Sequence, residues 1–541
     1  MKLRERQLER LKNETFDVAI IGGGINGAVA AAALAGKGAS VALIDRGDFA
    51  GETSSQSSNL AWGGIKYLES REFLLVNKLC KSRNLLMQSY PSTVKEIRFL
   101  TTIQKGFRFP PFFIYLGSLL YWVFGRFQTR APAYLRPAKL KRRDPAIDIS
   151  TAAGGLEYSD CFLSDNDSRF AFNFIRRAID EGASVANYLE STRWYREDDV
   201  WHHEVQNNLD GSRFTLRAKV TINACGPWVD QVNQIATVTT QHRHLFSKGV
   251  HLTVPRLSQN KRVLAFFASD GRLFFVIPMG PATCIGTTDT QVEAPETAVS
   301  DEDRRFIIDN VNRCLDLDEP LTVDDIIAER CGVRPLAVTS ETDCEDWVQL
   351  SRKHEIDVNE ELKTLSIFGG KITDCINVGE EIAKQIEKLG IPRKAADKKW
   401  YGEPSRVEHL KFLDAAEKAG LDQLTPASSP EPLSERLWRR YGNDAMDMLS
   451  AIAEDPGQAK LLIENAEYLR CELSYAAEKE MISKLEDFLR RRSKIEMVVS
   501  KKTIQDSAGV EEACKILFGD HWQEKLDEYI HSAPSPLPEI A

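Results

Sequence analysis

The chain has 541 residues, of which 43% are hydrophobic and 28% are charged, and its formal net charge is -9 at pH 7. This length predicts two or three domains with a sizeable core, and the acidic balance excludes nucleic acid as an expected partner. The first six residues are mostly charged and lack the apolar core of a secretory signal, so we expect a cytoplasmic protein.

Residues 17–45 predict a strand, a glycine turn, a helix and a second strand that ends in an acid. Gly22, Gly24 and Gly27 fit the G-x-G-x-x-G pattern. In it the first glycine permits a tight turn, the second lets the backbone approach a pyrophosphate, and the third lets the helix pack on the strand. Asp45 stands where a carboxylate binds the adenosine ribose. The segment predicts a bound dinucleotide with an intact ribose, FAD or NAD. The alternative is a glycine-rich turn in an unliganded α/β domain.

Three later segments favour FAD over NAD. The hydroxyl-rich loop 53–58 precedes Trp62, and its side chains offer hydrogen bonds to a pyrophosphate. Apolar strands run into glycines at 220–228 and 365–373. At the carboxyl ends of parallel strands, such glycines allow a ligand to approach the backbone. Each segment alone fits an ordinary turn, but together they indicate a flavin site.

The middle of the chain combines strands with one unusual apolar run. Residues 219–222, 273–277 and 283–285 have the composition of strands. Residues 109–124 are almost entirely apolar or aromatic and have basic flanks. Because a membrane-spanning helix needs about 20 such residues, the run predicts either a buried helix or an interfacial helix on a membrane surface.

After residues 398–404 the pattern becomes helical, with apolar residues three and four apart. In this part the basic cluster 490–492 is interpreted either as a solvated helix end or as an attraction for anionic lipid. The ten cysteines of the chain show no ligand spacing, so neither a metal site nor a disulfide framework is expected. Cys225 and Cys331 are interpreted as small packing residues.

These motifs resemble the signatures of the FAD-dependent glycerol-3-phosphate dehydrogenase and oxidase family. The resemblance runs from about residue 16 to about residue 500 and is carried by residues 21–27, 53–55, 63–69, 156–161, 223–228, 247–251, 275–278, 285–289, 332–336 and 368–373. It implies an α/β fold in which a Rossmann-like FAD-binding domain is interleaved with a β-rich α+β substrate domain, followed by an all-helical C-terminal domain. The expected segments are 16–85, 151–239 and 355–400 for FAD binding, 86–150 and 240–354 for the substrate lobe (together the oxidoreductase region 16–400), and 405–530 for the helical domain.

The resemblance also implies the residues of the site. His251, Arg334 and Lys371 are expected to be catalytic: His251 as proton acceptor, Arg334 as a bidentate cation at the junction of flavin and substrate, and Lys371 as a cation beside the reduced flavin. The substrate-binding residues are expected to be Trp62, Lys66, Tyr67, Arg334 and Thr373. The FAD-binding residues are expected to be Gly22, Gly24, Ile25, Asn26, Gly27, Asp45, Thr53, Ser54, Ser55, Gly63, Gly64, Gly226, Trp228, Gly370, Lys371, Ile372 and Thr373.

The chain departs from the family pattern around the expected phosphate pocket. Asn59, Trp62 and Lys66 stand where the family usually carries lysine, histidine and arginine, and residues 374–377 replace a stretch that usually carries tyrosine and arginine. Lys66 keeps its charge but lacks the planar two-pronged grip of arginine on phosphate. A pocket for a dianion therefore loses positive charge.

The expected activity is FAD-dependent oxidation of sn-glycerol 3-phosphate, a phosphorylated polyol, to dihydroxyacetone phosphate, with electrons passed to quinone or another acceptor. One alternative is a flavin oxidoreductase for a less anionic hydroxy or amino substrate, and another is a flavin-bound module without catalysis. Members of the family that reduce quinone are bound to membranes. The resemblance therefore favours the interfacial interpretation of residues 109–124, with attachment to the inner face of the cytoplasmic membrane. The sequence leaves a homodimer open.

Overall fold

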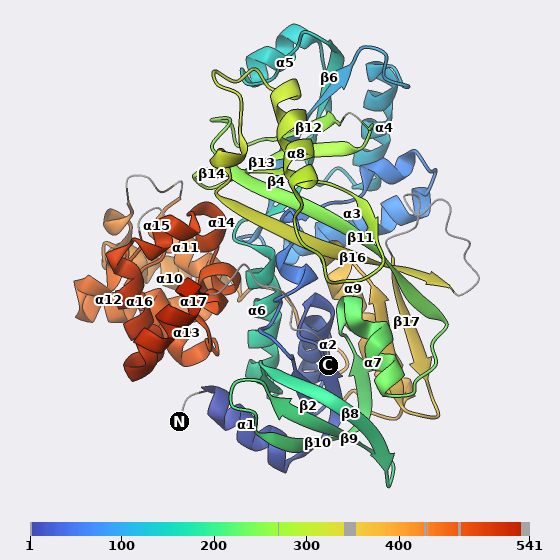
Figure 1. The fold of residues 1–541 in the computed structure, drawn as a ribbon, viewed down its shortest axis with the longest axis vertical. Helices are drawn as coiled ribbons and strands as arrows, with labels where there is room; N and C mark the ends of the chain where they lie inside the picture. The colour runs from blue at the N-terminus through green and yellow to red at the C-terminus, as the bar shows by residue number, and fades with distance from the viewer. Residues whose placement is uncertain are drawn as a thin grey trace.

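The structure is a computed structural model that describes residues 3–268, 270–339, 353–426, 429, 431–463 and 467–531. Within these residues two sheets are arranged along the long axis of the molecule, and the C-terminal helices form a separate group at one side (Figure 1). The mixed α/β fold class with a helical C-terminal part is confirmed.

The lower sheet in Figure 1, sheet A, is the nucleotide-binding type of sheet. Its main path has the order β17-β18-β10-β1-β2-β7, and the strands from β18 to β7 run parallel. The antiparallel strands β8 and β9 extend from β10. The strands are β1 (Thr15–Ile21), β2 (Val41–Ile44), β7 (Ser184–Ala186), β8 (Leu189–Glu197), β9 (Val200–Asn207), β10 (Arg213–Asn223), β17 (His354–Asn359) and β18 (Thr364–Gly369).

Helices pack on sheet A because the side chains on their inner faces are apolar, and in α2 most of them are small. The alanine-rich helix α2 is almost fully buried and contacts α6 and α9. The N-terminal helix α1 contacts β7. The helices associated with this part are α1 (Leu3–Asn13), α2 (Ile25–Gly36), α3 (Phe73–Ser89), α6 (Asp167–Asp180), α7 (Val229–Ile235) and α9 (Cys375–Lys388).

The upper sheet, sheet B, has the order β15-β11-β14-β13-β12-β4-β6-β3, with β16 paired to β11 and β5 to β6. Its strands are β3 (Leu60–Ala61), β4 (Val94–Gln104), β5 (Ala133–Leu135), β6 (Ala152–Leu163), β11 (His242–Pro255), β12 (Val263–Phe267), β13 (Leu273–Met279), β14 (Ala282–Gly286), β15 (Thr290–Val292) and β16 (Ala328–Thr339). The helices beside it are α4 (Pro111–Phe124), α5 (Pro137–Arg143) and α8 (Asp301–Cys314). The strands predicted at 219–222, 273–277 and 283–285 are confirmed.

The segment 151–239, which was predicted to bind FAD, contributes to both sheets. Its first strand, β6, belongs to sheet B, where it pairs with β4 from Val94 to Gln104. The reason is that β6 is a long partner of β4 and returns the chain to sheet A only through α6. The short β3 also pairs with β6. The chain therefore passes between the two sheets more than once, and one of these crossings lies between β6 and β7.

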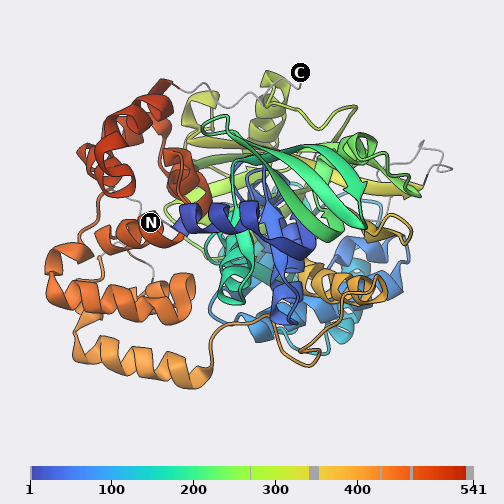
Figure 2. The same ribbon diagram turned by 90° about the horizontal axis from the view of Figure 1, so that it is seen from below.

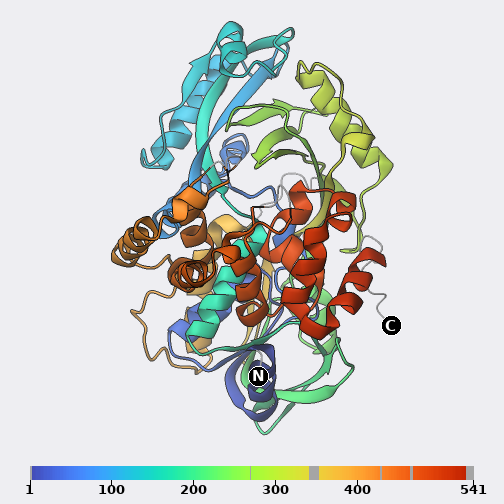
Figure 3. The same ribbon diagram turned by 90° about the vertical axis from the view of Figure 1, so that its left-hand side faces the viewer.

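The C-terminal helices form a group beside α6 (Figures 2 and 3). A one-turn π-helical segment, Asp487–Arg492, contacts α6. The helices are α10 (Arg406–Lys418), α11 (Leu433–Tyr441), α12 (Ala445–Glu454), α13 (Arg470–Lys479), α14 (Ile495–Val498), α15 (Lys501–Gln505), α16 (Ala508–Phe518) and α17 (Trp522–His531).

The apolar run 109–124 forms α4, and the structure decides against a buried helix. Only Ser118 and Tyr121 of α4 are buried. Phe112 and Phe113 are 58% and 59% exposed. One side of the helix packs Ile114, Tyr121 and Phe124 against the core, while the other side exposes apolar side chains to solvent. Among the described residues, no helix has the length and apolar character needed to cross a membrane.

Candidate functional site

The glycine turn between β1 and α2 has the geometry that the motif predicts. An added Cβ on Gly27 would lie 1.8 Å from the carbonyl oxygen of Gly22, and one on Gly22 would lie 2.5 Å from the carbonyl oxygen of Ala224. Gly22 also has a φ of +105°, which side chains rarely adopt. Helix, turn and β10 can therefore approach one another only with glycine at these positions.

Asp45 follows β2 and closes the same edge of sheet A. Its carboxylate accepts the backbone N–H of Gly23 at 2.6 Å and that of Gly47 at 2.9 Å. Burial raises the pKa of Asp45, and these two hydrogen bonds oppose the shift. The carboxylate therefore lies beside the glycine turn, as expected of a ribose-binding acid.

The side chains of the hydroxyl-rich loop 53–58 make two kinds of contact: some reach α2 and β16, and others stabilise the loop itself. Ser54 Oγ accepts the N–H of Ile25 at 2.9 Å, at the first turn of α2. Thr53 Oγ1 donates to the carbonyl oxygen of Val333 on β16 at 2.8 Å. Ser55 is fully buried, and its hydroxyl donates to the carbonyl oxygens of Gly51 and Glu52. Ser55 thus shapes the loop rather than offering its proton to a ligand.

The turn after β18 meets the N-terminus of α2. Asn26 Nδ2 donates to the carbonyl oxygen of Gly369 at 2.9 Å, and an added Cβ on Gly370 would lie 3.1 Å from Asn26 Oδ1. Gly369 and Gly370 both have positive φ, +65° and +109°. Two motifs 340 residues apart in the sequence are therefore joined at one edge of the sheet.

Four of the predicted substrate and cofactor residues lie together next to this turn. Lys371 Nζ donates to the Tyr67 hydroxyl at 2.8 Å, and the ammonium lies 4.4 Å from the Tyr67 ring centroid. Thr373 Oγ1 donates to the carbonyl oxygen of Trp62 at 3.3 Å. The rings of Trp62 and Tyr67 are 6.3 Å apart. This group places one fixed cation beside two aromatic side chains.

Arg334 comes from sheet B and points over Gly249 of β11. An added Cβ on Gly249 would lie 2.3 Å from the guanidinium, so only glycine leaves room for it. The guanidinium lies 3.3 Å from Asp289 Oδ1, and its other terminal nitrogen donates to Thr287 Oγ1 at 3.0 Å. On the same strand, an added Cβ on Gly332 would touch Gln56. This face of β16 therefore meets the hydroxyl loop.

His251 lies on the same face of sheet B, opposite Arg330 in the register of β11 and β16. Burial lowers the pKa of His251 well below its ordinary value, and the positive charges of Arg330 and Arg334 lower it further. The unperturbed pKa of histidine, on which the predicted role as proton acceptor was based, does not apply at this buried position. The imidazole is neutral at physiological pH.

The site fits a bound dinucleotide. The glycine turn and Asp45 are one indication. A second is that two buried polar atoms have no hydrogen-bond partner among the described residues: Gln56 Oε1 and His251 Nδ1, where sheet B meets the hydroxyl-rich loop. Such atoms are costly unless a ligand or water satisfies them. The described residues contain no group of three or more His, Cys, Asp or Glu side chains placed to hold a metal ion.

Comparison with known proteins identifies the family. Residues 17–347 match the model described as "FAD dependent oxidoreductase", and residues 405–519 match "C-terminal domain of alpha-glycerophosphate oxidase". This chain belongs to the FAD-dependent oxidoreductase family. The predicted family, enzyme class and FAD cofactor are thereby confirmed.

Relatives of this flavoprotein match it over almost its whole length. It is 30% identical to the aerobic glycerol-3-phosphate dehydrogenase of Staphylococcus haemolyticus, over 97% of this chain and 95% of that protein. It is 31% identical to glycerol-3-phosphate dehydrogenase 2 of Mycobacterium tuberculosis, over 94% of this chain and 86% of that protein. The solved glycerol-3-phosphate dehydrogenase of Bacillus halodurans, complexed with FAD, has the same fold with a TM-score of 0.72, at 23% identity over 100% of this chain and 99% of that one.

Two further segments that were predicted to bind FAD are held in place by contacts within the protein. Gly226 and Trp228 form a short turn after β10, where the Trp228 indole N–H donates to Glu296 at 2.9 Å and Arg46 lies 4.4 Å from the indole ring. Gly63 donates its N–H to Asp160 at 3.1 Å, and an added Cβ on it would lie 2.2 Å from the Tyr121 hydroxyl.

The structure adds supporting residues that the sequence analysis missed. Asp160 also accepts hydrogen bonds from Arg83 at 3.0 Å and from the Tyr121 hydroxyl. Arg330 is buried and donates to the carbonyl oxygen of Ser57. These partners come from distant strands and helices. Asp160 lies in the family segment 156–161 but was not singled out, and Arg83 and Arg330 lie outside the segments that carry the resemblance.

Two of the altered positions lie in different surroundings. Asn59 is buried, donates to the carbonyl oxygen of Asp165 at 3.3 Å and accepts the N–H of Asp167 at 3.2 Å. Its φ is +59°, a conformation that asparagine tolerates well. Asn59 therefore belongs to the frame of the loop rather than to the substrate pocket. Lys66 is exposed on the turn Ile65–Leu68, and its role in substrate binding stays a prediction.

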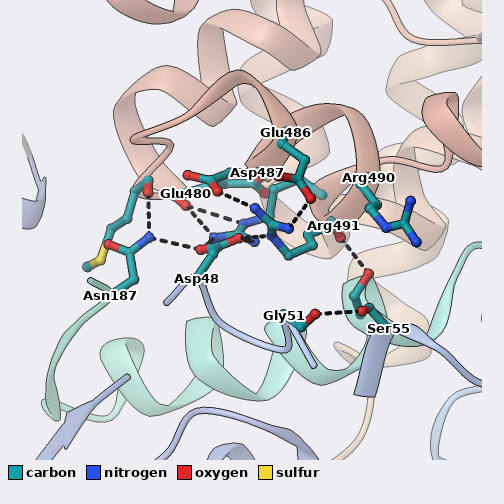
Figure 4. A network of polar contacts seen from close by, with 12 residues as sticks. Asp48, Gly51, Ser55, Asn187, Glu480, Glu486, Asp487, Arg490 and Arg491 are labelled. Carbon is teal, nitrogen blue, oxygen red and sulfur yellow. Dashed lines mark hydrogen bonds and ion pairs between the residues drawn. The ribbon is translucent and has the colours of Figure 1, made fainter. Parts of the chain in front are cut away.

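The basic cluster 490–492 was interpreted either as a solvated helix end or as an attraction for anionic lipid, and neither interpretation fits Arg491 and Arg492. Arg491 and Arg492 are buried and form ion pairs with Asp48 at 2.7 and 2.8 Å. The reason is that the helix end carrying them packs against the FAD-binding part rather than against solvent or lipid (Figure 4).

Proposed function

We propose that this flavoprotein oxidises sn-glycerol 3-phosphate to dihydroxyacetone phosphate and passes the electrons to quinone or another acceptor. Bound FAD supplies the hydride acceptor, the N5 atom of its isoalloxazine ring. The observation that carries the proposal is Lys371, whose ammonium is fixed on Tyr67 beside the strand-end glycines. The named activities of its relatives support the same substrate.

The residues of the chain divide the work of binding and proton transfer. Lys371 and the exposed Lys66 provide positive charge for the phosphate. Neutral His251 offers the lone pair of Nδ1 to the substrate hydroxyl and takes its proton as the C–H bond breaks. Arg334 holds the substrate oxygen, because a fixed guanidinium stabilises the negative charge that develops there. Trp62 excludes water next to Tyr67.

A second candidate is a less anionic hydroxy or amino substrate. The ion pair of Arg334 with Asp289 and the presence of Trp62 beside Tyr67 favour it, because both reduce the positive charge available to a dianion. In this case the pocket is remodelled around Trp62, and Lys371 binds a single carboxylate or hydroxyl group.

Anaerobic titration of the purified flavoprotein tests both proposals. Glycerol 3-phosphate is expected to bleach the flavin absorbance within the mixing time, whereas glycerol, lacking the phosphate, is expected to bleach it far more slowly. Bleaching only by hydroxy acids or amines would replace the first proposal by the second. A flavin that no compound of a wide panel reduces would identify a flavin-bound module without catalysis.

We also propose that α4 docks on a membrane surface. Its outward side carries Phe112, Phe113, Leu116, Leu120 and Val123, all exposed. Exposed Phe73, Leu74 and Phe127 lie on adjoining segments, and basic Arg108, Arg126 and Arg130 flank the helix. Apolar patches of this kind mark interaction surfaces, and basic residues at the rim suit anionic lipid. Such docking would bring the flavoprotein to a membrane-dissolved quinone.

Flotation with vesicles containing phosphatidylglycerol tests the docking. The wild-type protein is expected to float with the vesicles, and the double substitution Phe112→Ser, Phe113→Ser is expected to lower the bound fraction at least about tenfold, given the apolar area it removes. The matched control is Val407→Ser, Leu410→Ser on α10, where the side chains are 62% and 54% exposed. A wild-type protein that stays in the soluble fraction, or an equal loss in the control, would contradict the docking.

A further inference from the structure

The segment between β2 and the hydroxyl loop carries a buried carboxylate, Asp48. Arg492 binds it with two nitrogens, each 2.8 Å from a carboxylate oxygen, and Arg491 Nε adds a contact at 2.7 Å (Figure 4). Asn187 donates to the remaining side of the carboxylate at 2.8 Å. Burial would raise the pKa of Asp48, but the charges of Arg492 and Arg491 outweigh it and lower the pKa.

The two arginines are themselves held inside the interface. Arg491 forms further ion pairs with Glu486 at 2.9 Å and with Asp487 at 2.6 Å. The guanidinium of Arg492 lies 3.8 Å from the ring centroid of Phe172 on α6. The C-terminal domain thus presents a rigid pair of cations to a single carboxylate of the FAD-binding part.

Asp48 lies in the middle of the segment that supports the FAD site. Three residues before it, Asp45 accepts the N–H of Gly23, and six residues after it, Ser54 accepts the N–H of Ile25. Between them, Ala50 donates its N–H to the carbonyl oxygen of Gly23 at 3.0 Å. A movement of Asp48 would therefore be transmitted through this short segment to both sides of the glycine turn.

The opposite side of the segment is fixed by the N-terminal helix. Arg4 donates to the carbonyl oxygen of Asn187 at 2.8 Å and lies 3.2 Å from its amide oxygen, and Asn187 also donates to the carbonyl oxygen of Met481. The segment 45–55 and the C-terminal domain thus meet at Asp48, and α1 is linked to it through Asn187. None of the residues that meet there was predicted to contact FAD.

We infer that the C-terminal domain positions the FAD-binding segment, and that Arg491 and Arg492 do so by holding Asp48. They are positioning residues: they act on FAD through the backbone between Asp45 and Ser54. Releasing Asp48 leaves the FAD-contacting groups intact but allows them to move, which weakens FAD binding. This role goes beyond the proposed substrate and is independent of it.

The test measures the FAD dissociation constant of apoprotein reconstituted with FAD, followed by quenching of flavin fluorescence. Arg492→Met is expected to raise the dissociation constant about tenfold, within the range usual for coupling between distant sites, and Arg492→Lys is expected to restore part of the affinity. The control is Arg176→Met, which breaks another ion pair between α6 and the C-terminal domain, to Asp444 at 2.5 Å. The control is expected to lower the melting temperature of the apoprotein but to leave the dissociation constant within about twofold.

A double-mutant comparison separates positioning from general loosening of the interface. If Arg492 acts through Asp48, Asp48→Asn combined with Arg492→Met weakens FAD binding no more than the stronger single substitution. If Arg492→Met does not fold, Arg491→Met replaces it in the test. This substitution disturbs the structure less, because Arg492 still binds Asp48. Unchanged FAD affinity in the folded variants, or equal weakening in Arg176→Met, would overturn the inference.

Discussion

At the scale of single residues, the position of Arg334 depends on a missing side chain. Gly249 gives the guanidinium its place, while Asp289 and Thr287 fix its direction. The orientation of a cation affects how strongly it stabilises the transition state, because a preorganised group needs no rearrangement as the reaction proceeds. Gly249 is thus as important for the proposed chemistry as the arginine it accommodates.

Gly249→Ala is expected to lower kcat/KM for the substrate about 100-fold, because the new methyl group would displace the guanidinium. FAD content and melting temperature are expected to change little, since the neighbouring backbone is unaltered. Steady-state kinetics beside an absorbance spectrum of the purified variant measure both. Gly117→Ala on α4, where an added Cβ meets nothing within 4 Å, is the control. Full activity of Gly249→Ala would remove Arg334 from the reacting centre.

At the scale of elements, local motifs were predictable and the packing between them was not. The strand, turn and helix around Gly22 to Gly27 were predictable from one short segment, in which an added Cβ on Gly27 would meet the carbonyl oxygen of Gly22. The contact that requires glycine at position 22 is with Ala224, far away in the sequence. The outward face of α4 could not be read from its sequence, since an apolar run fits a core and a lipid surface equally well. The burial of Asn59 depends on Asp165 and Asp167, which lie more than 100 residues away.

The contact between β17 and α9 gives a pH-dependent stability. His354 is buried between Asp374, at 3.3 Å, and Glu381, at 2.9 Å. Burial alone would lower the pKa of His354, but these two carboxylates outweigh it and raise the pKa to about 9. Because the folded protein holds the proton more tightly than the unfolded chain, the stabilisation is full below about pH 6.5 and is lost between pH 6.5 and 9.

His354→Gln is expected to remove this stabilisation, about 3 kcal/mol at pH 6. Denaturant unfolding at pH 6 and at pH 9.5 measures it: the wild-type protein should lose more stability over this interval than the variant, by that amount. His242→Gln, which alters the half-buried contact with Asp357, provides a comparison at another histidine. Equal pH dependence of wild type and His354→Gln would show that the imidazole carries no stabilising proton.

At the scale of the whole molecule, ion pairs join parts of the chain that lie hundreds of residues apart. The contact of Asp48 with Arg492 spans 444 residues, and the contact of Asp165 with Arg440 spans 275. A sequence motif describes neighbours in the chain, so it could predict the C-terminal helices but not which of their charges enter the interface. The cluster 490–492 was therefore misinterpreted, whereas the strand-turn-helix motif of residues 17–45 was predictable, and its role in FAD binding stays a prediction.

The interface between the FAD-binding part and the C-terminal domain is expected to make them unfold together. Asp165 is buried and paired with both Arg439 and Arg440, and their charges lower its pKa although burial opposes this. Asp165→Asn removes the carboxylate that both guanidinium groups share, and leaves Arg439 with Glu431 and Arg440 with Glu472. The expected cost is therefore at the lower end of the about 3–5 kcal/mol that breaking a buried pair typically costs. Calorimetry should then resolve two transitions in place of one. Lys398→Gln, which breaks the more exposed pair with Glu181, should keep a single transition, because such surface pairs contribute about 1 kcal/mol or less. A single, unshifted transition in Asp165→Asn would mean that the pairs of Asp165 with Arg439 and Arg440 are not needed to couple the two parts.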